Sequence, residues 1–205
     1  MTTLVLATRN PHKVVELRRI LAEVGLDGVE LRGLDAFPGV PDVPETGVTF
    51  AENAALKAAA VAEATGLPAV ADDSGLCVDA LGGSPGVFSA RWSGVHGDDR
   101  ANLELLLGQL RDVPDAHRGA SFGCAAVAVL PGGRRLIAEG RLVGTLTRQP
   151  RGSNGFGYDP IFLPDGETRT TAELTPADKD AISHRGRAFR ALAELLRPAL
   201  VAPPA

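Results

Sequence analysis

The segment "TLVLATRNPHKVVELRRILAEVG", residues 3–25, predicts a β-strand that leads through a short loop into a helix. It opens with a mostly apolar run, and apolar residues then recur at helical spacing over residues 14–24. Asn10 is placed to cap the helix, Pro11 suits its first position, and Gly25 suits its C-terminal end. A strand followed at once by a capped helix indicates an α/β fold.

The remaining sequence predicts further strands and helices. Thr49 and Glu52 form a capping box for a helix that ends near Gly66. Apolar runs at 120–130 and 136–146 flank "PGG" and predict a β-hairpin. Because helices and strands alternate early and a hairpin follows, we expect an α/β fold with a mixed β-sheet flanked by helices. The other expected elements are strands at 3–7, at 29–34 and from 69 onward, and helices at 98–110, 176–181 and 184–200.

Length and composition narrow the class of protein. The chain has 205 residues, 44% of them hydrophobic, which predicts a single domain over residues 1–200 and a frayed tail at 201–205. The net charge of -4 argues against nucleic acid as a partner. No apolar run approaches the roughly 20 residues of a membrane span. Cys77 and Cys124 lack zinc or disulfide spacing, so we expect core thiols and a cytoplasmic location.

The first candidate site is the "TRNPHK" segment, residues 8–13, where the first strand meets its helix. Free backbone N–H groups and the positive end of the helix dipole favour an anion there, and Lys13 adds a positive charge. The segment is not a Walker P-loop, because GxxxxGK[ST] is absent. The alternative is an ordinary capped helix whose lysine is only solvated.

The second candidate site combines Glu45, in "PETG", with the adjacent carboxylates of "AVADDSGL". Carboxylates at strand ends suit Mg²⁺, which takes one or two of them together with substrate phosphates and water. Neighbouring strand residues point to opposite faces, so we expect Asp73 to face the ligand and Asp72 to face away. Asn53 and Lys57 share one helix face, which directs Lys57 toward the same site. The alternative is an ordinary capped turn.

Two later segments add a candidate pocket for a planar base. In "RGSNGFGYDP" the glycines permit close backbone approach, while Phe156 and Tyr158 offer flat faces. Lys179, His184 and Arg185 supply hydrogen-bond donors near the start of the last helix. The alternatives are a plain surface loop and a solvated basic patch.

One further motif is misleading. Residues 82–86 match the GxSxG pattern of α/β-hydrolases. That chemistry needs the backbone N–H of the residue after the serine as an oxyanion donor, and Pro85 has none. The sequence therefore argues against a serine hydrolase.

Taken together, five motifs resemble those of the noncanonical purine nucleoside triphosphate pyrophosphatases, also called inosine triphosphate pyrophosphatases. They are "ATRNPHK", "PETGVTFAENAALKA", "ADDSGLCVDALGGSPGVFSARW", "GFGYDPIF" and "AELTPADKDAISHRG", in the family's order over residues 4–190. The resemblance implies a mixed, curved sheet in two lobes with a central active-site cleft. It also implies a homodimer, a cytoplasmic location and a purine nucleoside triphosphate substrate.

The resemblance also implies roles for individual residues. It makes Glu45 and Asp73 the Mg²⁺ ligands and Asp73 the proton acceptor. The implied substrate contacts are Thr8, Arg9, Asn10, Pro11, His12, Lys13, Ser74, Phe156, Gly157, Tyr158, Asp159, Lys179, His184 and Arg185.

The expected reaction is Mg²⁺-dependent hydrolysis of ITP, dITP or XTP to nucleoside monophosphate and pyrophosphate, which cleanses the nucleotide pool. A carboxylate bound to a cation has a lowered pKa, so we expect Asp73 to act as a metal ligand more than as a base. Arg185 or His184 would accommodate the 6-oxo group of the base, which adenine lacks. The alternatives are a related pyrophosphatase with another base preference, a metal-dependent phosphatase and a nucleotide sensor.

Overall fold

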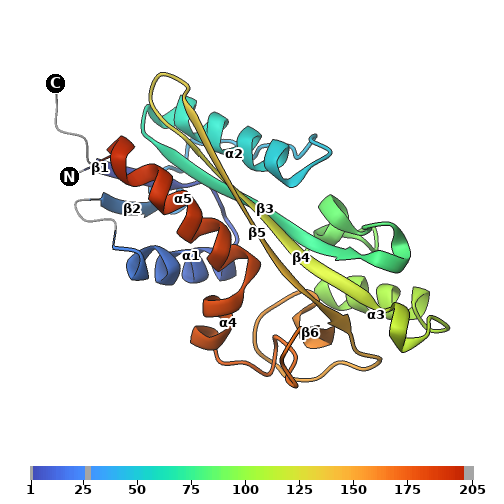
Figure 1. Cartoon of the computed structure of the whole chain (residues 1–205). Helices are drawn as coiled ribbons and strands as arrows, with labels where there is room; N and C mark the ends of the chain where they lie inside the picture. Colours follow the sequence, from blue (N-terminus) through green and yellow to red (C-terminus); the bar gives the residue numbers. More distant parts are fainter. Residues whose placement is uncertain (1, 26–28, 201–205) are drawn as a thin grey trace. The chain divides into compact units, whose positions relative to one another are not determined.

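The computed structural model of the chain describes residues 2–25 and 29–200, without the side chains of Pro11 and His12 (Figure 1). The expected tail at 201–205 lies outside the described residues. The chain divides into two compact units. Unit 1 comprises Met1–Asp73, Cys124–Gly140 and Arg185–Ala205, and unit 2 comprises Ser74–Gly123 and Arg141–His184.

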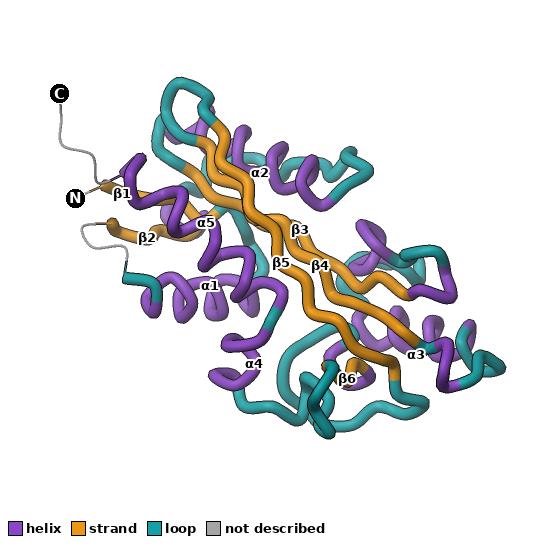
Figure 2. Tube along the Cα trace, viewed as in Figure 1, coloured by secondary structure: helices purple, strands orange, loops and turns teal. Residues whose placement is uncertain are grey.

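Six strands form one sheet in the order β2-β1-β3-β4-β5-β6. β1 pairs in parallel with β2 and β3, whereas β5 and β6 are antiparallel, so the prediction of a mixed sheet is confirmed. A tight turn at residues 130–134 joins β4 to β5 (Figure 2), as the "PGG" segment predicted. The strands are β1 (Thr2–Leu6), β2 (Val29–Gly33), β3 (Ala69–Val78), β4 (Gly119–Val129), β5 (Arg135–Leu146) and β6 (Phe162–Pro164).

The helices begin and end where the capping residues predicted. The Asn10 side chain accepts a hydrogen bond from the Lys13 amide at 3.3 Å. Both hydrogen bonds of the Thr49 and Glu52 capping box are formed, and Gly66 ends that helix in the left-handed conformation at φ 67°. The helices are α1 (Pro11–Glu23), α2 (Phe50–Thr65), α3 (Asp99–Gln109), α4 (Pro176–Ile182) and α5 (His184–Leu200). None of these described helices is long and apolar enough to cross a membrane.

In unit 1 the strands bury both faces. Leu4 and Leu6 of β1 pack in one core with apolar residues of α1 and α5, including Phe189. Val5, between them, packs in a second core with α2 residues such as Ala58. The alternation follows from the two-residue period of a strand, and burial of both faces explains the continuous apolar run in β1.

Unit 2 has its own apolar core. Side chains from the second half of β3 and the first part of β4 pack against α3 and against Tyr158 and Phe162. Between β5 and α4 the chain is mostly loop, interrupted by β6 and the short 3-10 helix Asp159–Ile161 (Figure 2). A loop of this length needs internal hydrogen bonds to hold one conformation.

The structure corrects one detail of the predicted strand. Asp72 and Asp73 were expected where the apolar run ends, but β3 continues to Val78 and places both carboxylates in its interior. Asp72 is 2% exposed and Asp73 is 6% exposed. A strand carries buried carboxylates only when each has charged or hydrogen-bonding partners, and local sequence does not reveal those partners.

Loss of the Thr49 cap should weaken α2. We expect Thr49→Ala to lower the free energy of unfolding by about 1 kcal/mol, because the Glu52 amide loses its acceptor. Urea denaturation measures this difference. Glu63→Ala, at an exposed position of the same helix, is the control and should change stability by less than about 0.5 kcal/mol. Equal effects of the two substitutions would contradict the assigned cap.

Candidate active site

Asp73 lies in a polar cluster formed with the first turns of α2. The buried Asn53 amide donates to Asp73 Oδ2 at 3.0 Å and accepts from the Gly47 amide at 2.8 Å. Lys57 Nζ lies 2.7 Å from Glu45 Oε1 and 3.8 Å from Asp73 Oδ1. The structure thus brings the two predicted metal ligands to a single ammonium group in unit 1.

The electrostatics of this cluster follow from two carboxylates near one ammonium group. Burial raises the pKa of Asp73, Lys57 opposes that rise, and the negative charge of Glu45 adds to it, so the pKa lies above its usual value. Burial by itself would lower the pKa of Lys57, but the carboxylates around it outweigh burial and raise it. Lys57 therefore stays charged, and Glu45 and Asp73 repel each other across it.

The residues suit a hard divalent cation. Mg²⁺ is bound through one or two carboxylates plus substrate oxygens and water, and this pair provides those two carboxylates. Across the described residues, no cluster of three or more His, Cys, Asp or Glu side chains is placed to hold a metal. A cation bound by two carboxylates takes its remaining ligands from substrate oxygens and water.

Asp72 lies in a second buried cluster of unit 1. Its Oδ2 atom is 3.0 Å from Lys13 Nζ and 3.1 Å from Arg185 Nε. Arg185, which is 1% exposed, also donates through Nη1 to Glu16 Oε2 at 2.5 Å. The thiol of Cys124 lies 4.0 Å from Asp72 Oδ2. Asp72 thus connects α1, β3 and α5 through charged groups.

The charges in this second cluster stabilise each other. Burial alone would raise the pKa of Asp72, but Lys13 and Arg185 hold it well below its usual range. Burial alone would lower the pKa of Arg185, and the charges of Asp72 and Glu16 raise it instead. Both side chains are therefore ionised across the physiological pH range. Removing one partner would leave an uncompensated buried charge, which costs about 3–5 kcal/mol.

Residues 8–13, which lead into the first turn of α1, are held by hydrogen bonds and ion pairs. Thr8 Oγ1 accepts from the Asn10 amide at 3.2 Å. The Arg9 side chain turns to Asp42, with Nε 2.8 Å from Oδ1. Lys13 is directed to Asp72, so the two cations of this segment already have acidic partners. The side chains of Pro11 and His12, also predicted substrate contacts, lie outside the described residues.

In unit 2, Asp159 organises the predicted base-binding loop. Asp159 Oδ2 accepts from the Phe156 amide at 2.9 Å and from Lys179 Nζ at 2.6 Å, while Oδ1 accepts from Thr171 Oγ1 at 2.8 Å. Lys179 Nζ lies 5.2 Å from the centre of the Phe156 ring. Position 155 must be glycine, since a Cβ there would meet Asp159 Oδ2 at 2.1 Å and φ is 77°.

The other predicted substrate contacts in unit 2 are Tyr158, Gly157, His184 and Ser74. The Tyr158 hydroxyl donates to the Ser89 carbonyl at 2.9 Å, and the Gly157 amide donates to Asp99 Oδ2 at 2.8 Å. His184 is buried and its ring stacks on Phe122, with centroids 4.8 Å apart. Ser74, directly after Asp73 in β3, is half-buried.

The predicted site residues therefore form two groups, one in each unit. Unit 1 holds residues 8–13, the carboxylate pair and Arg185, and unit 2 holds Ser74, the aromatic loop, Lys179 and His184. Glu16 is not predicted from the sequence, because an acidic residue among the polar positions of an amphipathic helix is usually solvated. Asn53 is expected on the same helix face as Lys57, but that spacing does not identify Asp73 as the partner of Asn53.

Comparison with known proteins places the chain in a family. The match to the Ham1 family covers residues 4–195. A "dITP/XTP pyrophosphatase" of Streptomyces avermitilis is 66% identical over 98% of this chain and 100% of its own length. Two solved structures are also similar. One, described as "Nucleoside-triphosphatase / dITP/XTP pyrophosphatase" from Mycobacterium abscessus, is 55% identical with a TM-score of 0.76 and covers 95% of this chain and 99% of its own.

The other structure is described as "a HAM1 protein" from Coxiella burnetii. It is 43% identical, with a TM-score of 0.86, and covers 96% of this chain and 98% of its own. Nearly the whole chain is matched in all these comparisons, and the matched range contains every predicted site residue. The chain belongs to the Ham1 family.

Proposed function

We propose that this chain hydrolyses noncanonical purine nucleoside triphosphates, such as ITP, dITP and XTP, to nucleoside monophosphate and pyrophosphate. The chain is a nucleoside triphosphate pyrophosphohydrolase, the class that the names of its similar relatives state. Such a reaction removes these nucleotides from the triphosphate pool. The observation that carries the proposal is the convergence of Glu45 and Asp73 on Lys57 beside the start of α2.

We assign Mg²⁺ to the Glu45 and Asp73 carboxylates. When bound there, the ion would neutralise charge on the triphosphate and polarise the phosphorus that is attacked. Asn53 fixes one oxygen of Asp73 by its hydrogen bond, which leaves the other oxygen toward Lys57 and Glu45. Lys57 offsets the charge of the carboxylate pair and supplies a cation for substrate phosphate.

The phosphates would lie at the N-terminus of α1, whose backbone N–H groups and dipole favour anions. Asp72 holds the Lys13 ammonium at 3.0 Å, which keeps its positive charge near that helix end. The nucleophile is a water that Asp73 orients, directly or through a second water. Its oxygen bonds to the α-phosphorus, its proton passes to Asp73 or to the second water, the bond from that phosphorus to the bridging oxygen breaks, and pyrophosphate leaves.

The base would stack on the aromatic loop of unit 2. Asp159 fixes the Phe156 backbone and positions Lys179 at the ring, so the loop is preorganised despite its glycines. Hydrogen-bond donors that face a 6-oxo group would favour hypoxanthine and xanthine over adenine, which presents a donor there. Arg185 is bound by two carboxylates and 1% exposed, which favours a positioning role for it over direct contact with the base.

We also propose that the enzyme is a cytoplasmic homodimer, as the sequence resemblance implies. Light scattering is expected to give about twice the chain mass of 21.3 kDa. Fractionation of cells is expected to recover the protein in the cytoplasm. A mass equal to that of one chain would contradict the dimer, and recovery with membranes would contradict the location.

A panel of triphosphates with product analysis tests substrate and reaction together. We expect ITP, dITP and XTP to be hydrolysed at least about a hundredfold faster than ATP, because adenine turns a donor toward the donors that face the 6-oxo group. GTP shares the 6-oxo group and should also react slowly, because its 2-amino group would be crowded or left without an acceptor. UTP and TTP should react slowly because they lack the purine ring. The product measured should be pyrophosphate. Release of orthophosphate would indicate a phosphatase instead, and a preference for a pyrimidine would indicate a related enzyme with another base preference.

Variants of the carboxylate pair test the metal site. Asp73→Asn should lower kcat at least about a hundredfold while ITP still binds in calorimetry, since the amide retains the shape but not the charge. Glu45→Gln should raise the Mg²⁺ concentration for half-maximal rate about tenfold, a loss of about 1.4 kcal/mol. Asp165→Asn, at an exposed position, is the matched control and should leave both values unchanged. Full turnover by Asp73→Asn would refute the assignment.

A further inference from the structure

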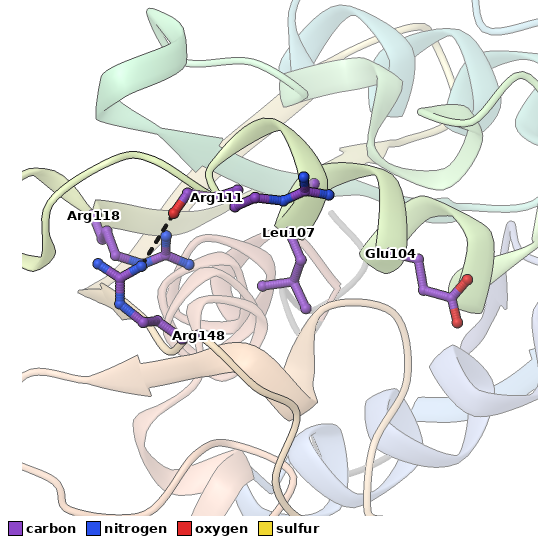
Figure 3. Close-up of a pocket in the computed structure, with 6 residues that line it drawn as sticks. Glu104, Leu107, Arg111, Arg118 and Arg148 are labelled. Carbon is purple, nitrogen blue, oxygen red and sulfur yellow. Dashed lines mark hydrogen bonds between the residues drawn. The ribbon is translucent and has the colours of Figure 1, made fainter.

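Unit 2 contains a pocket of about 330 Å³ beside helix α3 (Figure 3). Three of its six lining residues are arginines and one is acidic, so the lining carries a net positive charge at neutral pH. None of the six belongs to the residues assigned above to substrate or metal. They are Glu104, Leu107, Gly108, Arg111, Arg118 and Arg148.

Arg118 is the buried cation of this pocket, with 2% of its surface exposed. Its guanidinium donates to three backbone carbonyls, those of Leu110 at 2.7 Å, Leu146 at 2.8 Å and Thr147 at 3.0 Å. Carbonyls satisfy N–H groups but do not neutralise the charge. No carboxylate within residues 2–25 and 29–200 forms an ion pair with Arg118.

The guanidinium of Arg148 adds a second positive charge beside that of Arg118. Figure 3 shows Arg148 next to Arg118. Burial and the charge of Arg148 both lower the pKa of Arg118, and the opposing effect of Asp115 is smaller. Arg148 Nε donates to Asp115 Oδ1 at 2.8 Å, so the nearest acidic group is already paired, and it is also largely exposed to water. Two like charges are thus held together by the backbone around them.

Arg111 completes the cationic lining from the end of α3. The Arg111 carbonyl accepts a hydrogen bond from Arg148 Nη1 at 3.2 Å, which connects the Arg148 side chain to the backbone just after α3 (Figure 3). The exposed guanidinium of Arg111 makes no hydrogen bond or ion pair with any described residue. Glu104, the one acidic lining residue, accepts from Arg100 Nε at 2.7 Å, so its charge is partly offset.

We propose that this pocket binds a small oxyanion of the phosphate class, such as phosphate or pyrophosphate, at a second site. The Arg111 guanidinium presents planar pairs of N–H donors that match two oxygens of such an anion, while Arg118 and Arg148, whose nitrogens already donate to carbonyls and to Asp115, contribute positive charge. An anion would compensate the charge that Arg118 and Arg148 share in the folded protein. The volume lies at the low end for ligand pockets and suits a ligand of this size. The proposal stands independently of the proposed reaction.

Binding of inorganic pyrophosphate to the full chain, with EDTA present, tests the proposal. NMR titration should shift the amide signals of Leu107 and Gly108 with a saturable dependence, which separates this pocket from binding elsewhere. Fluorescence of Trp92, the one tryptophan in the sequence, gives a second readout because its indole donates to Gln109 of α3 at 2.9 Å.

Arg111→Gln is the decisive variant, because its side chain makes no bond that the fold needs. It should weaken the affinity reported by Leu107 and Gly108 about tenfold, as expected for one charge-assisted contact. Arg148→Lys retains the charge but loses the planar donors that hold the side chain in place, and it should weaken affinity as well. Arg135→Gln, at an exposed arginine of β5, is the matched control and should have no effect. Absence of saturable shifts at Leu107 and Gly108, or wild-type affinity in Arg111→Gln with an unchanged melting temperature, would overturn the proposal.

Discussion

The structure of unit 1 depends on two adjacent carboxylates buried in the interior of β3. Consecutive strand residues point to opposite faces, so Asp72 and Asp73 need separate partners. A buried carboxylate is costly unless it is paired and hydrogen-bonded. The chain meets this requirement with Lys13 and Arg185 on one side and Lys57 on the other. These ion pairs connect α1, α2 and α5 to β3.

The two faces of β3 differ in the balance of charge around their carboxylates. Around Asp72, Arg185 and Glu16 complete a buried network that connects three elements of the fold, which is a structural role. Around Asp73, the carboxylate of Glu45 adds a second negative charge beside the single positive charge of Lys57. This excess of negative charge supports the assignment of a cation and a phosphate substrate there. Of these two neighbouring carboxylates, Asp72 stabilises the fold and positions Lys13, and Asp73 is the proposed metal ligand.

Two buried charged groups of unit 2, one negative and one positive, have hydrogen bonds that are satisfied in different ways. Asp159 binds a backbone amide, a lysine and a threonine, and so orders a glycine-rich loop that would otherwise lack a fixed conformation. Arg118 is instead satisfied by carbonyls and keeps its charge without a carboxylate. The first arrangement supports a preorganised base site, and the second supports the proposed anion pocket.

The sequence by itself determined the helix ends, the family and most strand positions, but not the continuation of β3 past Asp73 or the short strand β6. Caps such as Asn10 and Thr49 act over three or four residues, and strand and helix periods are read within one element, so local sequence contains that information. Only the tertiary structure decided which charges meet. Arg185 reaches Glu16 across 169 positions of sequence, and Asn53 reaches Asp73 across 20. The positions of such partners depend on how strands pair and helices pack, because burial creates the electrostatic demand that these contacts satisfy.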